Sequence, residues 1–213
     1  MRSSLLFIAA TLVLSGCALP LMQSAAPDIP SGSVLYQDDF STTASGWDRL
    51  AHDGGIMDYD GSGSRILVTA EGANVWSTPN RDFLDARIEV DAGKLGGPDS
   101  NRIGLICRDD GKSHYFFVIG SDGYYGLGIF TGGKAALLGQ AAMKPSEAIT
   151  QGTAVNHLRL DCDGSSLAGY VNGVKVAQVQ DATLAHGEVG VLAGAFAEPG
   201  ADIVFDNFVV LQP

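Results

Sequence analysis

Short glycine-containing turn signals recur along this chain and constrain its fold more than any other feature. Each lies between apolar or alternating runs of residues, and the pairs begin at Asp110, Asp122, Gly132, Asp163 and Asn172. Asn-Gly and Asp-Gly supply the positive φ angles that two-residue β-hairpins require. From Val34 onward, no segment sustains the apolar period of about 3.6 residues that indicates a surface helix. The pattern therefore predicts an all-β chain of antiparallel strands.

Runs of alternating or uniformly apolar residues define roughly a dozen expected strands. They cover Val34–Asp38, Arg65–Thr69, Asn74–Ser77, Ala86–Ala92, Arg102–Arg108, His114–Ile119, Tyr124–Phe130, Ala135–Gly139, His157–Asp163, Leu167–Val171, Lys175–Gln180, Glu188–Ala193 and Asp202–Leu211. The segment Lys144–Gln151 carries a weak helical signal and is interpreted as a loop element. Turns about ten residues apart favour a two-sheet antiparallel sandwich over βαβ units.

Composition excludes several classes of protein. Apolar residues make up 46% of the chain and charged residues only 17%, which argues against intrinsic disorder. Against 13 Lys and Arg stand 24 Asp and Glu, a formal net charge of −11, and no basic run occurs. We therefore expect neither binding to nucleic acid nor attachment to a membrane through a polybasic patch, because both depend on clustered Lys and Arg.

The N-terminus reads as a targeting segment. Arg2 precedes a largely apolar run from Leu5 to Leu14, which is too short to span a bilayer and fits the apolar core of a signal peptide. The run ends in Leu-Ser-Gly-Cys, which looks like the lipobox of bacterial lipoproteins, with Cys17 as the lipidated residue; a plain secretory signal with an accidental cysteine is the alternative. We expect residues 1–16 to be a signal peptide, 17–33 a lipidated tether and 34–213 the folded domain.

This reading places the protein in a bacterial cell envelope. The lipid at Cys17 would hold it on the outer side of the cytoplasmic membrane, or in an outer membrane where one is present. In that oxidising compartment, Cys107 and Cys162 form an expected disulfide, because strand alternation directs both side chains toward the core. Two inert buried thiols are the alternative. A zinc site is disfavoured, since no His lies at a ligand spacing from either cysteine.

Four segments together resemble the concanavalin A-like lectin/glucanase superfamily, in the branch of laminin G-like and 3-keto-disaccharide hydrolase-type domains. They are Asp38–Trp47, Asn101–Gly128, Asn156–Gly173 and Phe205–Val210. The resemblance covers residues 34–211 and implies a two-sheet jelly-roll sandwich whose concave face binds glycans in members of the family. The same architecture carries lectins, glycosidases and structural modules, so it does not by itself imply one activity.

Candidate ligand-binding residues gather in the central segment. A sugar site needs aromatic faces for its C–H groups and planar polar groups for its hydroxyls, and the strand ends here supply both. If the central strands form sequential hairpins, these ends meet near one rim; the alternative is that the aromatics belong to the core or the sheet surface. Asn101 with Arg108 has a spacing similar to that in the hydrolase-type domains. The candidates are Trp76, Asn101, Arg108, Asp110, His114, Tyr115, Asp122 and Tyr125.

The sequence lacks the usual catalytic patterns. The E-x-D-x-E strand motif of the superfamily's glucanases is missing, although Glu89 and Asp91 share a strand face and form either a carboxylate pair or a solvated edge. No nucleophile with a His partner is evident, so no catalytic residue is assigned. A structural Ca²⁺ near the joined termini is a further expectation, with turn capping as the alternative. Its ligands would be Asp38, Asp39, Asp206 and Asn207.

These observations favour a lipid-anchored envelope protein whose jelly roll binds carbohydrate or another surface polymer without catalysis. Two alternatives stay open. One is a glycoside hydrolase that acts on a 3-keto-disaccharide or related sugar. The other is a structural or protein-interaction module of the envelope.

Overall fold

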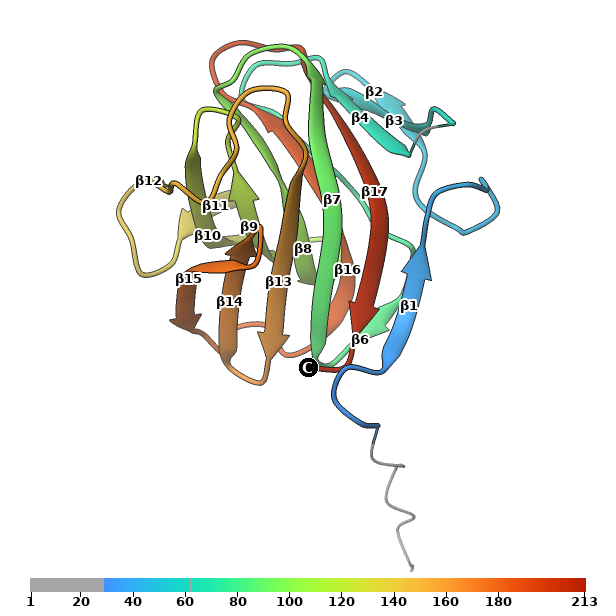
Figure 1. Cartoon of the computed structure of the whole chain (residues 1–213), viewed down its shortest axis with the longest axis vertical. Coiled ribbons are helices and arrows are strands. Elements are labelled where there is room, and N and C mark those ends of the chain that lie inside the picture. The colour runs from blue at the N-terminus through green and yellow to red at the C-terminus, as the bar shows by residue number, and fades with distance from the viewer. Residues whose placement is uncertain (1–28, 62) are drawn as a thin grey trace, which may run out of the picture.

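Two antiparallel β-sheets packed face to face form the whole of the described structure, which is a computed structural model (Figure 1). It describes residues 29–61 and 63–213, and these contain no helix. The expected all-β jelly-roll sandwich is therefore confirmed. The expected signal peptide, the expected lipidation site Cys17 and most of the expected tether lie outside the described residues.

Sheet A has nine strands and sheet B has eight. Along sheet A the order is β15 (Val174–Gln180), β14 (Ser166–Val171), β13 (Asn156–Asp163), β7 (Ala86–Gly96), β17 (Ala201–Leu211), β4 (Ser64–Val68), β3 (Gly55–Tyr59) and β2 (Leu50–His52), with β1 (Val34–Asp38) also paired to β17. Along sheet B it is β11 (Lys134–Leu137), β10 (Tyr124–Thr131), β9 (His114–Ile119), β8 (Asn101–Asp109), β16 (Gly187–Ala195) and β5 (Asn74–Ser77), while β12 (Lys144–Pro145) pairs with β10 and β6 (Asp82–Phe83) with β16.

The turn signals lie where the chain reverses. Asn172 and Gly173 have φ angles of 49° and 82° and join β14 to β15, so that Val171 faces Val174. Gly132 and Gly133, with φ of 58° and 75°, join β10 to β11 in the same way. Positive φ at both central residues is the signature of the hairpin turn that matches strand twist.

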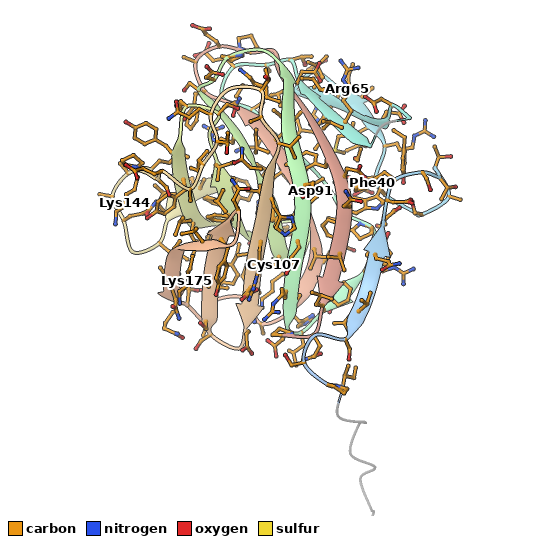
Figure 2. All side chains as sticks on the ribbon, viewed as in Figure 1. Phe40, Arg65, Asp91, Cys107, Lys144 and Lys175 are labelled. Carbon is orange, nitrogen blue, oxygen red and sulfur yellow. A yellow bond between two sulfur atoms is a disulfide. The ribbon has the colours of Figure 1, made fainter. Side chains whose placement is uncertain are left out.

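The main core fills the space between the sheets. Phe205 and Phe208 of β17 and Phe117 of β9 are at most 1% exposed, and they pack against aliphatic residues of both sheets. Cys107 lies within the sandwich, whereas Lys144 and Lys175 lie at its margin (Figure 2). Burying such residues stabilises the fold by about 1.5–3 kcal/mol each.

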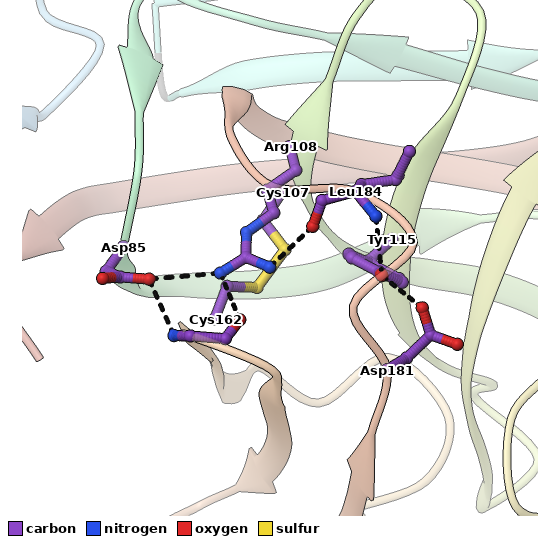
Figure 3. The surroundings of a disulfide bond; sticks show 8 residues. Asp85, Cys107, Arg108, Tyr115, Cys162, Asp181 and Leu184 are labelled. Carbon is purple, nitrogen blue, oxygen red and sulfur yellow. Dashed lines mark hydrogen bonds and ion pairs between the residues drawn. A yellow bond between two sulfur atoms is a disulfide. The ribbon is translucent and has the colours of Figure 1, made fainter.

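A disulfide between Cys107 of β8 and Cys162 of β13 joins the two sheets (Figure 3). Both cysteines are 1% exposed, as strand alternation predicted. The expected disulfide is therefore confirmed. It closes a loop over a sequence separation of 55 residues.

The two ends of the described chain meet. The amide of Gly32 donates to the carbonyl of Gln212, and the amide of Gln212 donates to the carbonyl of Ser33. The first described strand begins at Val34, and residues 29–33 lie beside the C-terminus (Figure 1). Among the described residues, no helix has the length and apolar character needed to cross a membrane.

Candidate functional site

A groove of about 560 Å³ lies on the face of sheet B that points away from the main core. Residues of β5, β8, β9, β10 and β16 form its floor, and the β10–β11 hairpin with Met143 forms one wall. Its lining is Gly72, Asn74, Trp76, Arg102, His114, Phe116, Val118, Phe130, Gly133, Ala135, Ala136, Leu137, Met143, Leu192 and Phe196.

Strand alternation explains why an apolar surface lies there. In β9, Tyr115 and Phe117 enter the main core, so Phe116 and Val118 point to the opposite face together with His114. Phe116 and Val118 form a second buried apolar cluster together with Ile106 and Leu192. Both faces of β9 are buried, which makes the strand apolar throughout rather than alternating.

Three rings make one end of the groove. The indole of Trp76 meets the imidazole of His114 edge-on, with ring centroids 5.1 Å apart. The imidazole in turn stacks on the ring of Phe130 at 5.2 Å and 19° between planes. His114 is only 2% exposed, and its Nδ1 has no hydrogen-bond partner among the described residues. The result is a fixed aromatic platform in which an imidazole is the central ring.

Asp109 lies behind this platform and orients it. Its Oδ2 accepts a hydrogen bond from Trp76 Nε1 at 3.2 Å, and its Oδ1 lies 3.6 Å from His114 Nδ1. Oδ1 also accepts the amide proton of Gly111, which fixes the carboxylate to the β8–β9 turn. Asp109 is 6% exposed and does not line the groove. It is therefore a positioning residue for Trp76.

A β-bulge gives Asp109 this role. Between paired positions, β8 advances by the three residues from Ile106 to Asp109 while β16 advances by two, from Glu188 to Gly190. Arg108 is the bulged residue, and its backbone has a φ of 55°. An inserted residue reverses the alternation beyond it. The bulge therefore turns Asp109 toward Trp76 and sends Arg108 to the opposite face.

Arg102 lies in the groove on β8, level with Gly194 of β16 and Asn74 of β5. Its Nη1 donates to Asn74 Oδ1 at 2.9 Å and to the carbonyl of Ala195 at 2.8 Å. The guanidinium stacks on Phe196, 3.8 Å from the ring centroid. Burial lowers the pKa of the guanidinium, because removal from water disfavours its charged form.

Three of the eight candidate residues are internal. Arg108 is 3% exposed and donates to the carbonyls of Leu184 and Gly164 and to Asp85 (Figure 3). Tyr115 is fully buried, with its hydroxyl between Asp181 and the amide of Leu184. Asn101 is also fully buried, and its amide group bonds Ser121 and the carbonyl of Pro98. These three side chains hold the fold together and do not reach the groove.

Three more candidates lie outside the groove. The expectation of one common rim is corrected here, because β8, β9 and β10 alternate in direction and their turns fall at opposite ends of the sheet. Asp122 lies at the far end in a separate shallow hollow, and Tyr125 packs against the main core. Asp110 is exposed and accepts the amides of Lys112 and Ser113, which hold the pKa of its carboxyl below the usual range. Only Trp76 and His114 line the groove.

The carboxylates near the joined termini act on their own turns. Asp38 is 8% exposed and accepts hydrogen bonds from the amide of Phe40 and from Trp47 Nε1. Asp39 caps Ser41, and Asp206 bonds the amide of Asn207. In the described part of the chain, no three His, Cys, Asp or Glu side chains are grouped as a metal ion requires. These contacts favour turn capping over Ca²⁺ binding, and Ca²⁺ stays an untested prediction.

Glu89 and Asp91, the pair of acids considered on one strand, lie on the outer face of sheet A. His157 contacts both, with Nδ1 2.8 Å from Asp91 Oδ1 and Nε2 3.4 Å from Glu89 Oε2. The His157 side chain is 44% exposed, and the Asp91 side chain also accepts from Asn207. These residues form a solvated polar cluster on the sheet opposite the groove.

Sequence reasoning missed most of the groove. Five lining residues were not among the candidates: Asn74, Arg102, Phe116, Phe130 and Phe196. Counting alternate residues outward from His114 would have reached Phe116, and the hairpin register pairs His114 with Phe130. The uniformly apolar β9 obscured this, since its outward and inward residues are equally hydrophobic.

The comparisons with known proteins bear on the fold. No family model matches the sequence, and no curated protein matches it. Among solved structures, a carbohydrate-binding module, CBM66, from Bacillus subtilis aligns with a TM-score of 0.65 at 18% identity, over 78% of this chain and 96% of that one. A protein of unknown function with a galectin-like fold, also from Bacillus subtilis, gives 0.62 at 14% identity, over 86% and 97%.

A glycoside hydrolase family 16 endo-glucanase from Bacteroides ovatus is similar as well, with a TM-score of 0.56 at 16% identity over 84% of this chain and 100% of that one. These likenesses confirm the two-sheet jelly-roll fold. Because the fold carries both binding modules and hydrolases, function must be argued from the groove.

Proposed function

We propose that this chain is a non-catalytic carbohydrate-binding module. The observation that supports it is the groove on sheet B, where Trp76, His114 and Phe130 form a fixed platform beside apolar walls. The C–H face of a sugar ring packs on such a platform, and Asn74 and Arg102 supply polar groups for its hydroxyls. A preformed platform lowers the ordering cost of binding.

The absence of acids from the groove lining favours binding over hydrolysis. Glycosidases of the usual kind need two carboxyl groups on either side of the scissile bond. No Asp or Glu is among the described residues that line the groove. Asn101 and Arg108, the pair that supported a hydrolase of the 3-keto-disaccharide type, bond protein groups inside the fold.

The proposal includes a lipid anchor at Cys17. The lipobox-like sequence supports it, and the cross-sheet disulfide fits an oxidising compartment outside the cytoplasm. Residues 29–33, which precede β1, lie beside the C-terminus, whereas the groove lies on sheet B. Metabolic labelling with a palmitate analogue tests this part, and labelling should vanish in Cys17→Ala.

A binding assay against immobilised polysaccharides tests the central part. The full-length chain should be used in a nonionic detergent without a sugar headgroup. We expect retention by at least one polysaccharide, and Trp76→Ala should weaken it by roughly 30-fold, the effect of losing a contact of about 2 kcal/mol. Tyr170→Ala is the matched control, because this aromatic lies on β14 of the other sheet beneath Arg159.

Two outcomes would contradict the proposal. One is equal binding by wild type and Trp76→Ala. The other is a folded protein that binds no polysaccharide in a broad panel. Turnover of a glycoside would instead identify a hydrolase and would require acids that the groove lining does not provide.

A further inference from the structure

The charge of the groove is opposite to that of the protein. The chain carries 24 Asp and Glu against 13 Lys and Arg. Within the described lining of the groove, however, no acid occurs, and Arg102 and His114 are the ionisable side chains. An anionic ligand in this groove would meet no negatively charged side chain in the lining and would lie close to the positive charge of Arg102.

Arg102 is the one partly buried base of the described chain that lacks an acidic partner. Five other basic side chains are buried or half-buried, and each pairs with an aspartate: Arg65, Arg87, Lys94, Arg108 and Arg159. Within the described residues, Arg102 donates hydrogen bonds only to the neutral oxygens of Asn74 and Ala195. A guanidinium withdrawn from water gains most from a carboxylate when one is supplied.

The donors of Arg102 are arranged so that one whole edge stays open. Both side-chain hydrogen bonds of Arg102 to described residues use Nη1, and neither uses Nε or Nη2. This edge presents two parallel N–H groups, the geometry that binds a planar carboxylate in bidentate fashion. The stacked Phe196 ring fixes the plane of the guanidinium.

Neighbouring residues are shaped to hold Arg102 in this position. Gly194 lies between its two hydrogen-bond partners, and a Cβ at that position would lie 2.2 Å from Asn74 Oδ1 and 3.1 Å from Arg102 Nη1. Any larger residue would therefore displace the Asn74 side chain. The close contact between Asn74 and Arg102 depends on glycine at position 194.

We propose that the groove takes an acidic saccharide, with a uronic acid carboxylate bound by the Nε–Nη2 edge of Arg102. A following sugar ring lies toward the platform of Trp76, His114 and Phe130. This inference rests on the proposed carbohydrate-binding function and specifies its ligand class. The neutral Asn74 amide, the open guanidinium edge and the acid-free lining together select a carboxylate over a neutral substituent.

The test compares acidic oligosaccharides with their own neutral forms. Uronate trisaccharides, each paired with its methyl ester, are titrated into the full-length chain by calorimetry, in the same detergent and at constant ionic strength. At least one acid should bind at least about tenfold tighter than its ester, as expected for one charge-assisted interaction. Because the ligand is altered and the protein is not, the comparison does not depend on whether a variant folds.

Variants then locate the effect. Arg102→Gln should reduce the preference for acid over ester to about one, and Arg102→Lys should restore only part of it, since a lysine lacks the fork. Arg81→Gln is the matched control, because Arg81 is exposed, has no aspartate partner and stacks on Tyr36 away from the groove. It removes the same charge and should leave the preference unchanged.

Other results would overturn the inference in distinguishable ways. Equal binding of acids and esters, or binding of neutral sugars alone, would overturn the uronate assignment and leave the carbohydrate function intact. Competition by hexanoate or by an acidic peptide as strong as that by the saccharide would show recognition of a carboxylate without the sugar. Binding of neither acids nor neutral sugars would overturn both proposals.

Discussion

The backbone at Arg108 decides which face of sheet B the side chains of Arg108 and Asp109 take. Regular alternation from the cysteine at position 107 predicts an outward Arg108, and the bulge reverses this from that residue onward. Asp109 thereby reaches Trp76, and Arg108 bridges three backbone and side-chain acceptors inside the fold. A two-residue period cannot reveal an inserted residue, so the sequence identified this region and misassigned its faces.

Tyr115 is a second residue whose position the sequence alone did not reveal. Its aromatic ring in the central segment suggested a ligand contact, whereas its hydroxyl joins Asp181 to the amide of Leu184 inside the fold. Burial, followed by the bond to Asp181, raises the pKa of the Tyr115 hydroxyl. Tyr115→Phe should lower the free energy of unfolding at neutral pH by about 1–3 kcal/mol.

The pH dependence of that loss can be given a sign. Burial alone would raise the pKa of Asp181, but hydrogen bonds from Tyr115 and Thr183 lower it overall from 3.8. A lowered carboxyl pKa adds stability above the unfolded value that is lost as pH falls through the folded value. In urea unfolding, the difference in free energy of unfolding between wild type and Tyr115→Phe should therefore shrink as the pH falls below 3.8. Tyr124→Phe, an exposed hydroxyl, is the control; a difference that does not vary with pH would contradict this account.

At the scale of elements, turn chemistry made the long strands predictable. Asn172-Gly173 and Gly132-Gly133 adopt the expected hairpin angles. Sequence reasoning missed β3, whose five residues begin with a glycine and include an aspartate, two residue types that are depleted in strands. It also missed three shorter strands because of their exposure and length. All three residues of β2 are exposed, and β6 and β12 have only two residues each, so none can show a period. Their existence depends on a neighbouring strand rather than on their own sequence. In Lys144–Gln151, β12 is followed by turns, in agreement with a loop element.

The disulfide gives a prediction at the same scale. It ties β8 of one sheet to β13 of the other across 55 residues of chain. Restricting a loop of that length in the unfolded state stabilises the native state by about 4 kcal/mol. Reduction should lower the urea midpoint accordingly, and the double variant Cys107→Ala/Cys162→Ala should unfold at a low midpoint that reductant no longer changes. Equal midpoints for oxidised and reduced protein would show that the bond contributes no stability.

At the scale of the whole molecule, the sandwich separates structural polar groups from the groove. The acids are engaged in turns, in ion pairs and beneath the aromatic platform, and the described groove lining holds none. Sequence reasoning reached the fold, the disulfide and two lining residues, Trp76 and His114. It did not identify the other lining residues, because strands that are far apart in the sequence form the groove. The residue pattern of a single strand does not determine which strands lie beside it in the sheet.

The most direct test of the central claim uses the two tryptophans as reporters. The chain has two, and each indole N–H has a different carboxylate acceptor: Trp76 bonds Asp109 at the groove, and the buried Trp47 bonds Asp38 on the far side of the core. Nuclear magnetic resonance should therefore show two indole N–H signals, assigned with Trp76→Phe. On titration with the saccharide that binds tightest, the Trp76 signal should shift in proportion to occupancy while the Trp47 signal stays in place. Saturated binding that leaves the Trp76 signal unmoved would contradict a carbohydrate site in this groove.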